Sequence, residues 1–230
     1  MGRNNLLSSS EGGVILKFRL KMRERLNPLL APLRRRKLYN TNFTIISNNC
    51  WAGHVYRYFG IPYLTPTVGL YFFADDYLKL LQRLRYYMQQ DLHFISLSES
   101  KHQNELLDHG GKSLTCPIGV LDDIEVIFLH YKTAEEAQHK WYRRRERMNW
   151  DNLYVKMSQM NGCSEDMMKE FDLLPFDNKF LFVKQKYGLS SEVKYGGYEN
   201  ANEIANDTNN FRHYIKLSNW LNGKPFRKNQ

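Results

Sequence analysis

The stretch FTIISNNCWAGHVYRYFG, residues 43–60, carries the pattern that decides the fold of this 230-residue chain. Its first part, residues 43–47, is short, apolar and β-branched, which predicts a buried strand. Residues 51–59 predict a helix that ends at Gly60. Two asparagines and Cys50 therefore fall between a strand and a helix, where α/β proteins present backbone N–H groups and a side chain to a ligand.

Strand and helix signals alternate along the rest of the chain. Further strands are predicted over residues 93–97, 124–129, 153–157 and 180–183. Helices are predicted from residue 75 to about 89 and over 133–148, 164–174 and 211–221, with polar loops over 98–117 and 187–210. This alternation predicts a single α/β domain over residues 41–230, a three-layer α/β/α fold with a mainly parallel sheet.

The positive charge is concentrated at the N-terminus. Residues 1–40 contain ten lysines and arginines and two glutamates, which accounts for +8 of the net charge of +9. We therefore expect a basic N-terminal arm ahead of the domain. Its residues 14–37 mix apolar and basic side chains, so they form either a contact with the inner-membrane surface or a solvated leader. Because no nucleic-acid recognition motif accompanies the charge, a nucleic-acid partner is not expected.

The composition indicates a cytoplasmic protein, or one held peripherally at the inner membrane face by the arm. No run approaches the roughly 20 apolar residues of a membrane span, and the first residues lack the apolar core of a secretory signal. The three cysteines are widely spaced and show no metal-binding spacing, so we expect reduced thiols.

Cys50 and His130 are the predicted catalytic residues. A helix N-terminus stabilises a thiolate and lowers a cysteine pKa, and its free N–H groups can receive an acyl oxyanion. His130 follows the strand 124–129, and it would reach Cys50 as a general base if that strand runs parallel to strand 43–47. The alternative is a buried thiol and a strand-end histidine bonded to a loop. His54, one helical turn beyond Cys50, is a weaker base candidate.

Amide, aromatic and guanidinium side chains supply the predicted substrate contacts. Amides after the first strand could hold a carbonyl or a sugar hydroxyl, and an indole could stack on a sugar. Arginines away from the apolar stripe of the 133–148 helix could attract phosphates, although a solvated face is the alternative. The predicted substrate-binding residues are Asn48, Asn49, Trp51, Arg143, Arg144 and Arg147.

Two acidic pairs are candidate metal ligands, Asp75-Asp76 and Asp122-Asp123. Either pair could bind a divalent cation on a nucleotide-sugar diphosphate. The first pair follows the apolar run 68–73 and is better placed, although acidic residues at a helix start are also ordinary capping. The second pair directly precedes the predicted strand 124–129. It therefore lies at the N-terminal end of that strand, away from the sheet edge where ligands bind if the strand is parallel.

Four stretches carry a family resemblance: residues 43–81, PIGVLDDIEVIFLHY (117–131), AEEAQHKWYRRRERMNWDNLYVKM (134–157) and NGCSEDMMKEFDLLPF (161–176). Together they resemble a bacterial family catalogued as a domain of unknown function and often labelled exopolysaccharide-biosynthesis protein. The resemblance covers about residues 40–185. The family commonly has glycine after the tryptophan, where this chain has Ala52. The resemblance implies an α/β fold and a place in surface-polysaccharide production.

These observations lead to one main functional hypothesis and two alternatives. The main hypothesis is a transferase of exopolysaccharide or capsular polysaccharide biosynthesis that moves an acyl group through Cys50, from a donor such as acetyl-CoA, to a glycan or lipid-linked glycan. One alternative is a metal-dependent glycosyltransferase that uses Asp75 and Asp76. The other is a non-catalytic component that binds a glycan or a lipid carrier. No cofactor is expected beyond the acyl donor or, for the glycosyltransferase, the metal.

Overall fold

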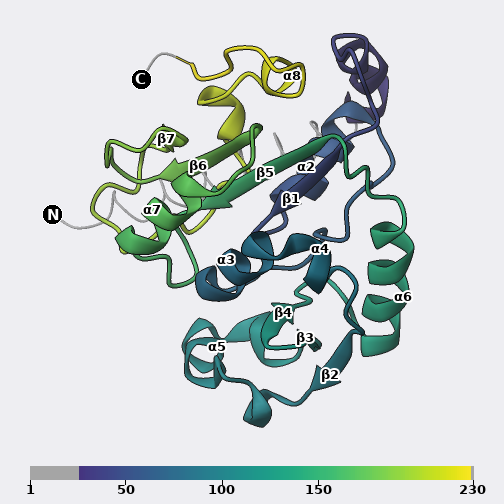
Figure 1. Cartoon of the computed structure of the whole chain (residues 1–230), viewed down its shortest axis with the longest axis vertical. Coiled ribbons are helices and arrows are strands. Elements are labelled where there is room, and N and C mark those ends of the chain that lie inside the picture. The colour runs from purple at the N-terminus through teal and green to yellow at the C-terminus, as the bar shows by residue number, and fades with distance from the viewer. Residues whose placement is uncertain (1–25, 229–230) are drawn as a thin grey trace, which may run out of the picture.

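The main sheet of the molecule has four strands, all parallel. A computed structural model describes residues 26–228 and is shown in Figure 1. The strands are β1 (Thr44–Ser47), β5 (Leu153–Ser158), β6 (Lys179–Val183) and β7 (Glu192–Lys194), in the order β1-β5-β6-β7. The predicted α/β fold with a mainly parallel sheet is confirmed.

Side-chain alternation along the strands divides the core between the two faces of this sheet. Ile45 packs with α2 (Trp51–Phe59) and α8 (Leu217–Trp220), whereas Ile46 packs with α3 (Ala74–Gln82) and α7 (Glu165–Leu173). Successive strand residues point to opposite faces, so neighbouring isoleucines serve different layers. Both faces are thus covered, as a parallel sheet requires.

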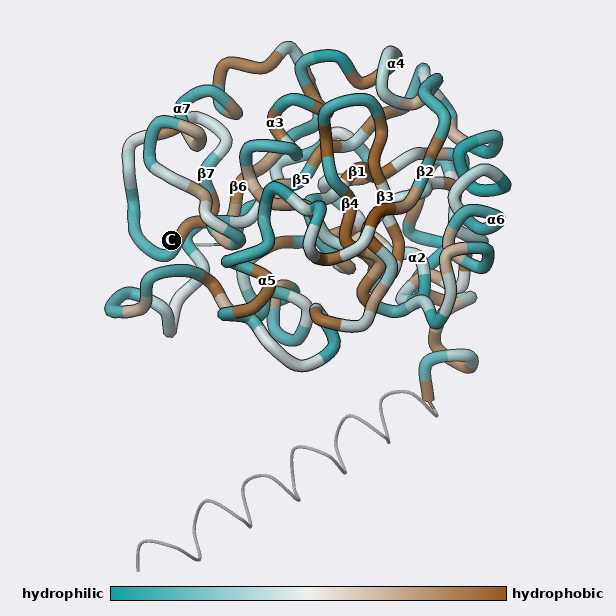
Figure 2. Tube along the Cα trace, turned by 90° about the horizontal axis from the view of Figure 1, so that it is seen from below, coloured by the Kyte–Doolittle hydropathy of each residue, from teal (hydrophilic) through white to brown (hydrophobic). Residues whose placement is uncertain are grey.

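A second, antiparallel sheet holds the strand predicted over residues 124–129. It consists of β2 (His93–Ile95), β3 (Ile118–Leu121) and β4 (Ile124–Ile127), and its apolar strands are brown in Figure 2. The expectation that this strand belongs to the parallel sheet was wrong. A two-residue turn, Asp122-Asp123, joins β3 to β4, and Asp122 has a φ of 56°. Because of this tight turn, β4 pairs with its neighbour in sequence, β3, and not with β1.

Several predicted elements differ in their extent. The helix predicted from residue 75 to 89 is broken at Arg83 into α3 and α4 (Leu84–Tyr87). The polar stretch 98–117, predicted as a loop, contains α5 (Gln103–His109) and the 3-10 turns η1 (Leu97–Glu99) and η2 (Gly111–Leu114). In the 211–221 region, η3 (Phe211–His213) precedes α8. Helix α6 (Ala134–Arg145) is capped by Thr133, whose hydroxyl accepts the Glu136 N–H at 3.2 Å.

The segment 68–73 connects the two sheets. Tyr71 exchanges two backbone hydrogen bonds of 2.9 Å with Ile127 of β4, and the Phe72 N–H donates to the Asn48 carbonyl at 3.0 Å. The segment therefore lies between the end of β1 and the end of β4. It brings the residues that follow these two strands to one region of the molecule.

Part of the predicted basic arm packs on the domain. Residues 26–35 are helical and include Pro28 and Pro32. Residues 1–25 of the arm lie outside the described residues. No helix between residues 26 and 228 is long and apolar enough to cross a membrane.

Candidate functional site

A cavity of about 390 Å³ lies where β1, β5 and β4 end. Its wall comes from the β1–α2 turn, from the segment after β5, from residues 203–208, and from η2 and the end of α5. The carboxyl edge of a parallel sheet is the usual ligand site of α/β domains. The polar lining of the cavity includes Asn49, Cys50, His54, His109, His130 and Asp207.

Cys50 occupies the N-cap position of α2, as predicted from the sequence. Its Sγ lies 3.5 Å from the Leu70 carbonyl oxygen. The pKa of the thiol is raised to about 11, first by burial and then by the charge of Asp207, although Lys156 opposes this effect. The expected lowering of the pKa by the helix N-terminus is therefore outweighed, because loss of water disfavours the thiolate more. Cys50 is a protonated thiol at neutral pH.

The first N–H groups of α2 already have partners. The Trp51 N–H donates to Asn49 Oδ1 at 3.1 Å, and the Ala52 N–H donates to Ser47 Oγ at 3.2 Å. These donors are the ones that an acyl oxyanion beside Cys50 would use. An oxyanion would have to displace the side chains that cap the helix, contrary to the expectation of free N–H groups.

His130 lines the same cavity as Cys50 by a different route from the one expected. Strand β4 does not run beside β1; instead, the His130 N–H donates to the Gly69 carbonyl at 2.9 Å, one residue before the Leu70 carbonyl that contacts Cys50. The pKa of His130 is lowered by partial burial and by the charges of Lys112 and Arg57. A neutral imidazole can accept a proton. His54 lies in the cavity wall as well.

Gly69 makes this route sterically possible. Its φ is 75°, in the left-handed region that favours glycine. A Cβ added there would lie 3.4 Å from the Cβ of His130 and 3.2 Å from the ring of Tyr131. The close approach of the connecting segment therefore fixes where the histidine sits.

A buried ion pair beneath the cavity was missed by the sequence analysis. Lys156 of β5 and Asp207 are both fully buried and form a salt bridge, and Lys156 Nζ also donates to Asn49 Oδ1 at 3.2 Å. Asp207 accepts hydrogen bonds from Asn49 Nδ2 at 2.9 Å and from Ser158 Oγ at 2.5 Å. The lysine inside the apolar strand LYVKMS is the one sequence feature that indicates a buried charge here. Its partner, Asp207, lies in the polar stretch 187–210, which was predicted to be loop.

The two predicted asparagines take different positions. Asn48 is fully buried: its Nδ2 donates to the Ser158 carbonyl, and its Oδ1 accepts the Ser158 N–H, both at 3.1 Å. It thus extends the β1–β5 ladder and does not face a ligand. Asn49 lines the cavity, but its amide is committed to Asp207. Both side-chain amides therefore already have protein partners, contrary to the expectation that they contact a substrate carbonyl.

Asn161, after β5, adopts a φ of 54° in the cavity wall. Its N–H donates to Glu203 Oε2 at 2.6 Å and its Nδ2 to the Phe72 carbonyl at 3.0 Å. Left-handed non-glycine residues cluster at functional sites, where the surrounding contacts hold them.

The other predicted contact residues do not line the cavity. Trp51 is fully buried among the rings of Phe180, Phe211 and Trp220, so it has no surface for a sugar. Arg144 is buried and donates to Tyr131 Oη at 2.5 Å, so its guanidinium holds α6 against the segment before it. Arg143 is exposed on α6, and Arg147 is exposed just after the end of that helix. The remaining thiols, Cys116 and Cys163, are free, as is Cys50.

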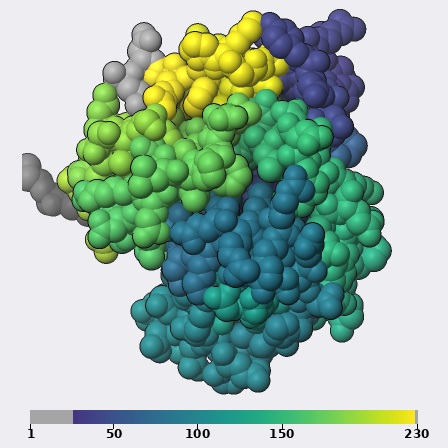
Figure 3. Space-filling model, viewed as in Figure 1, coloured from purple at the N-terminus to yellow at the C-terminus, as the bar shows by residue number. Residues whose placement is uncertain are grey.

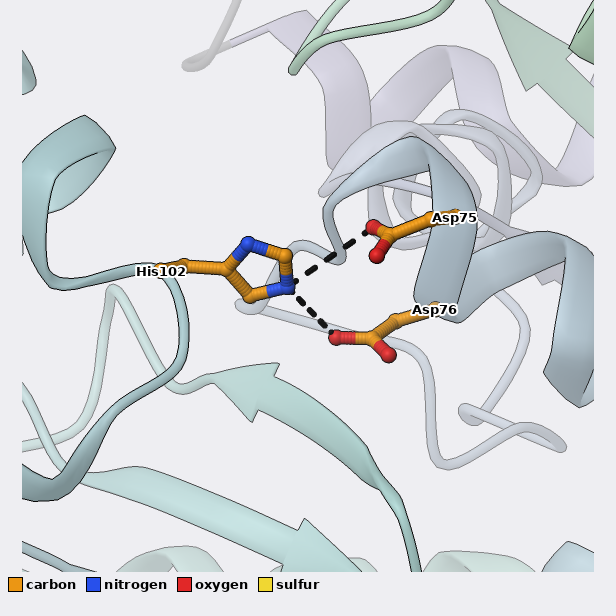
Figure 4. A group of neighbouring side chains, drawn as sticks. All are labelled: Asp75, Asp76 and His102. Atoms are coloured by element: carbon orange, nitrogen blue, oxygen red, sulfur yellow. Dashed lines mark hydrogen bonds and ion pairs between the residues drawn. The ribbon is translucent and has the colours of Figure 1, made fainter.

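Asp75 and Asp76 meet a third residue, His102, as Figure 4 shows. One ligand atom from each of the three lies within 4.8 Å of the others. His102 Nε2 is 2.8 Å from Asp76 Oδ2, and the Lys101 ammonium forms an ion pair with Asp76 Oδ1. Asp76 also accepts the Glu125 N–H at 3.1 Å. These contacts tie α3 to β4 and α5, and a divalent cation bound by all three residues would have to replace the hydrogen bond between His102 and Asp76.

Comparison with known proteins identifies a family. Residues 22–222 match a family model described as "Domain of unknown function (DUF1919)". An uncharacterized protein of Haemophilus influenzae is similar to this chain, with 32% identity over 192 residues, which cover 83% of this chain and 82% of that protein.

Proposed function

We propose that this chain, which belongs to the DUF1919 family, is a transferase of surface-polysaccharide assembly. The acyl group that it transfers passes through Cys50. The acceptor is a glycan or a lipid-linked glycan, and the donor is a thioester such as acetyl-CoA. The observation that carries this proposal is the presence of a thiol and a neutral imidazole in one polar cavity. Its volume lies in the ordinary range for small-molecule sites, about 300–1,000 Å³.

The raised pKa of Cys50 determines which mechanism is proposed. With a pKa of about 11, forming the thiolate at pH 7 costs roughly 5 kcal/mol, so the thiol needs a base during attack. His130 takes the thiol proton while sulfur attacks the thioester carbonyl. The tetrahedral adduct then expels the donor thiolate, which recovers the proton from the imidazolium.

The second half of the reaction reverses these roles. An acceptor hydroxyl loses its proton to His130 and attacks the Cys50 thioester, and the leaving Cys50 thiolate is reprotonated by the imidazolium. The products are an O-acyl glycan and the original thiol. Among the described residues the Cys50 hydrogen bond goes to Leu70, so the thiol must rotate toward His130 when the donor binds.

The same raised pKa favours a second candidate, a non-catalytic glycan-binding component. A buried, protonated thiol is also what a structural cysteine would show. In that case the cavity histidines would bind sugar hydroxyls and Cys50 would only fill space. The glycosyltransferase alternative rests on Asp75 and Asp76, outside this cavity.

One experiment separates these candidates. A variant with Cys116→Ser and Cys163→Ser, retaining Cys50, is incubated with acyl-CoA donors and examined by intact-protein mass spectrometry. The transferase predicts an acyl adduct that is lost in Cys50→Ser and reduced in His130→Gln. Glycan binding by Cys50→Ser without any adduct in the parent protein would support the binding component. Nucleotide-sugar turnover that requires divalent metal and Asp76 would support the glycosyltransferase instead.

A further inference from the structure

The helix over residues 26–35 presents an apolar stripe to solvent. Leu26, Leu29, Leu30 and Leu33 are 43, 72, 39 and 55% exposed. Their spacing of i, i+3, i+4 and i+7 places all four on one side of the helix. A stripe that normally faces a core here has no partner among the described residues.

The opposite side of this helix is fixed to the domain. Ala31 is buried, and three side chains donate to backbone carbonyls at or just after the C-terminal end of α2. The donors are Asn27 at 2.7 Å, Arg34 at 3.2 Å and Arg35 at 3.0 Å. The outward direction of the leucines is therefore set by specific contacts on the inner side of the helix.

Basic grooves lie on both sides of the helix. One, of about 420 Å³, contains Arg35 and Arg57. The other, of about 300 Å³, separates the helix end from the C-terminal segment, which are the adjacent purple and yellow regions of Figure 3. It contains five cations and no carboxylate: Arg34, Lys37, Arg212, Lys216 and Lys228. Within residues 26–228 none of these seven cations forms a salt bridge.

We propose that the helix 26–35 and its two flanking grooves form a docking face for an anionic lipid membrane. The leucines would enter the boundary between headgroups and acyl chains, and the cations would contact lipid phosphates. A nucleic acid or an acidic polysaccharide would satisfy the cations but would leave the leucines in water, so the combination favours a membrane.

This docking face is connected to the cavity of the candidate site. Arg57 of α2 lines one of the grooves, and His54, one turn earlier in the same helix, lines the cavity. A membrane-held substrate would therefore lie near the cavity when the docking face is engaged. The docking proposal itself does not depend on the transferase proposal.

The test is sedimentation of the full chain with vesicles of phosphatidylcholine mixed with phosphatidylglycerol, compared with phosphatidylcholine alone. Leu29→Ser combined with Leu33→Ser should weaken binding to the anionic vesicles at least about tenfold, because two exposed leucines no longer leave water.

A second variant tests the charge. Removing three docking-face charges should weaken binding roughly a hundredfold, at about fivefold per charge. A matched control removes three exposed charges from elsewhere and should bind within about threefold of the unmodified chain. The docking-face variant is Lys37→Gln, Arg57→Gln and Lys216→Gln, and the control is Lys132→Gln, Arg143→Gln and Lys186→Gln.

Three results would overturn the proposal. The first is no binding of the unmodified chain to anionic vesicles. The second is undiminished binding by the leucine variant, which would indicate a polyanion surface. The third is equal loss in the control, which would indicate an effect of net charge alone. All substituted side chains are exposed, and an unchanged melting temperature confirms that each variant is folded.

Discussion

The buried pair of Lys156 and Asp207 gives the sharpest quantitative test of this structure. Asp207→Asn leaves the ammonium of Lys156 fully buried without its carboxylate, and it weakens the acceptor of the Ser158 and Asn49 hydrogen bonds. Removing one partner of a buried pair typically costs about 3–5 kcal/mol. In a chain of this size that corresponds to a loss of roughly 6–20 °C in melting temperature.

The double variant isolates the interaction itself. Lys156→Met with Asp207→Asn removes both charges, so its loss of stability should be at least about 2 kcal/mol smaller than the sum of the two single losses. Urea unfolding at pH 7 measures all four proteins. Lys169→Met is the matched control: Lys169 forms exposed ion pairs with Glu165 and Asp166, and its loss should cost under about 1 kcal/mol.

The pH dependence provides an independent check. Burial lowers the pKa of Lys156 in the folded protein below its ordinary 10.5, and Asp207 opposes this shift. Without Asp207 the folded protein binds fewer protons than the unfolded chain as the pH rises toward 10.5. The Asp207→Asn variant should therefore regain stability over that range. Single losses below about 1 kcal/mol that simply add, with no recovery at high pH, would refute this account.

Three further predictions concern the cavity. Gly69→Ala should cost about 1–2 kcal/mol in urea unfolding, because of its φ of 75° and the 3.4 Å contact with His130; an unchanged stability would mean that the segment can shift freely. The pKa of Cys50, from pH-dependent alkylation, should lie near 11 and fall in Asp207→Asn, since a negative charge that disfavours the thiolate is removed; no change would show that the two groups are not coupled. The pKa of His130, from NMR of its ring protons, should lie below 6.5 and rise in Lys112→Gln; a value above 6.5 would contradict the proposed neutral base.

Local sequence patterns were sufficient for the elements around Cys50. The apolar run before it forms β1, the predicted helix 51–59 coincides with α2, and Gly60 ends that helix in the left-handed conformation. These features depend on residues close in the chain, so period, capping and glycine placement determine them. The same patterns predicted the layered fold, because alternating strands and helices have few ways to bury both faces of a parallel sheet.

Contacts between distant residues decided the site. The route of His130 to the cavity depends on a hairpin that places β4 in a second sheet and on the backbone of Gly69. Residues 156 and 207 meet across 51 positions, and no periodic pattern links a lysine in a strand to an aspartate in a loop. The pKa of Cys50 depends on how much water is excluded around it, which only the packed structure determines. The sequence thus determined the elements and their layers, while the tertiary structure decided which side chains share the cavity and in which protonation state.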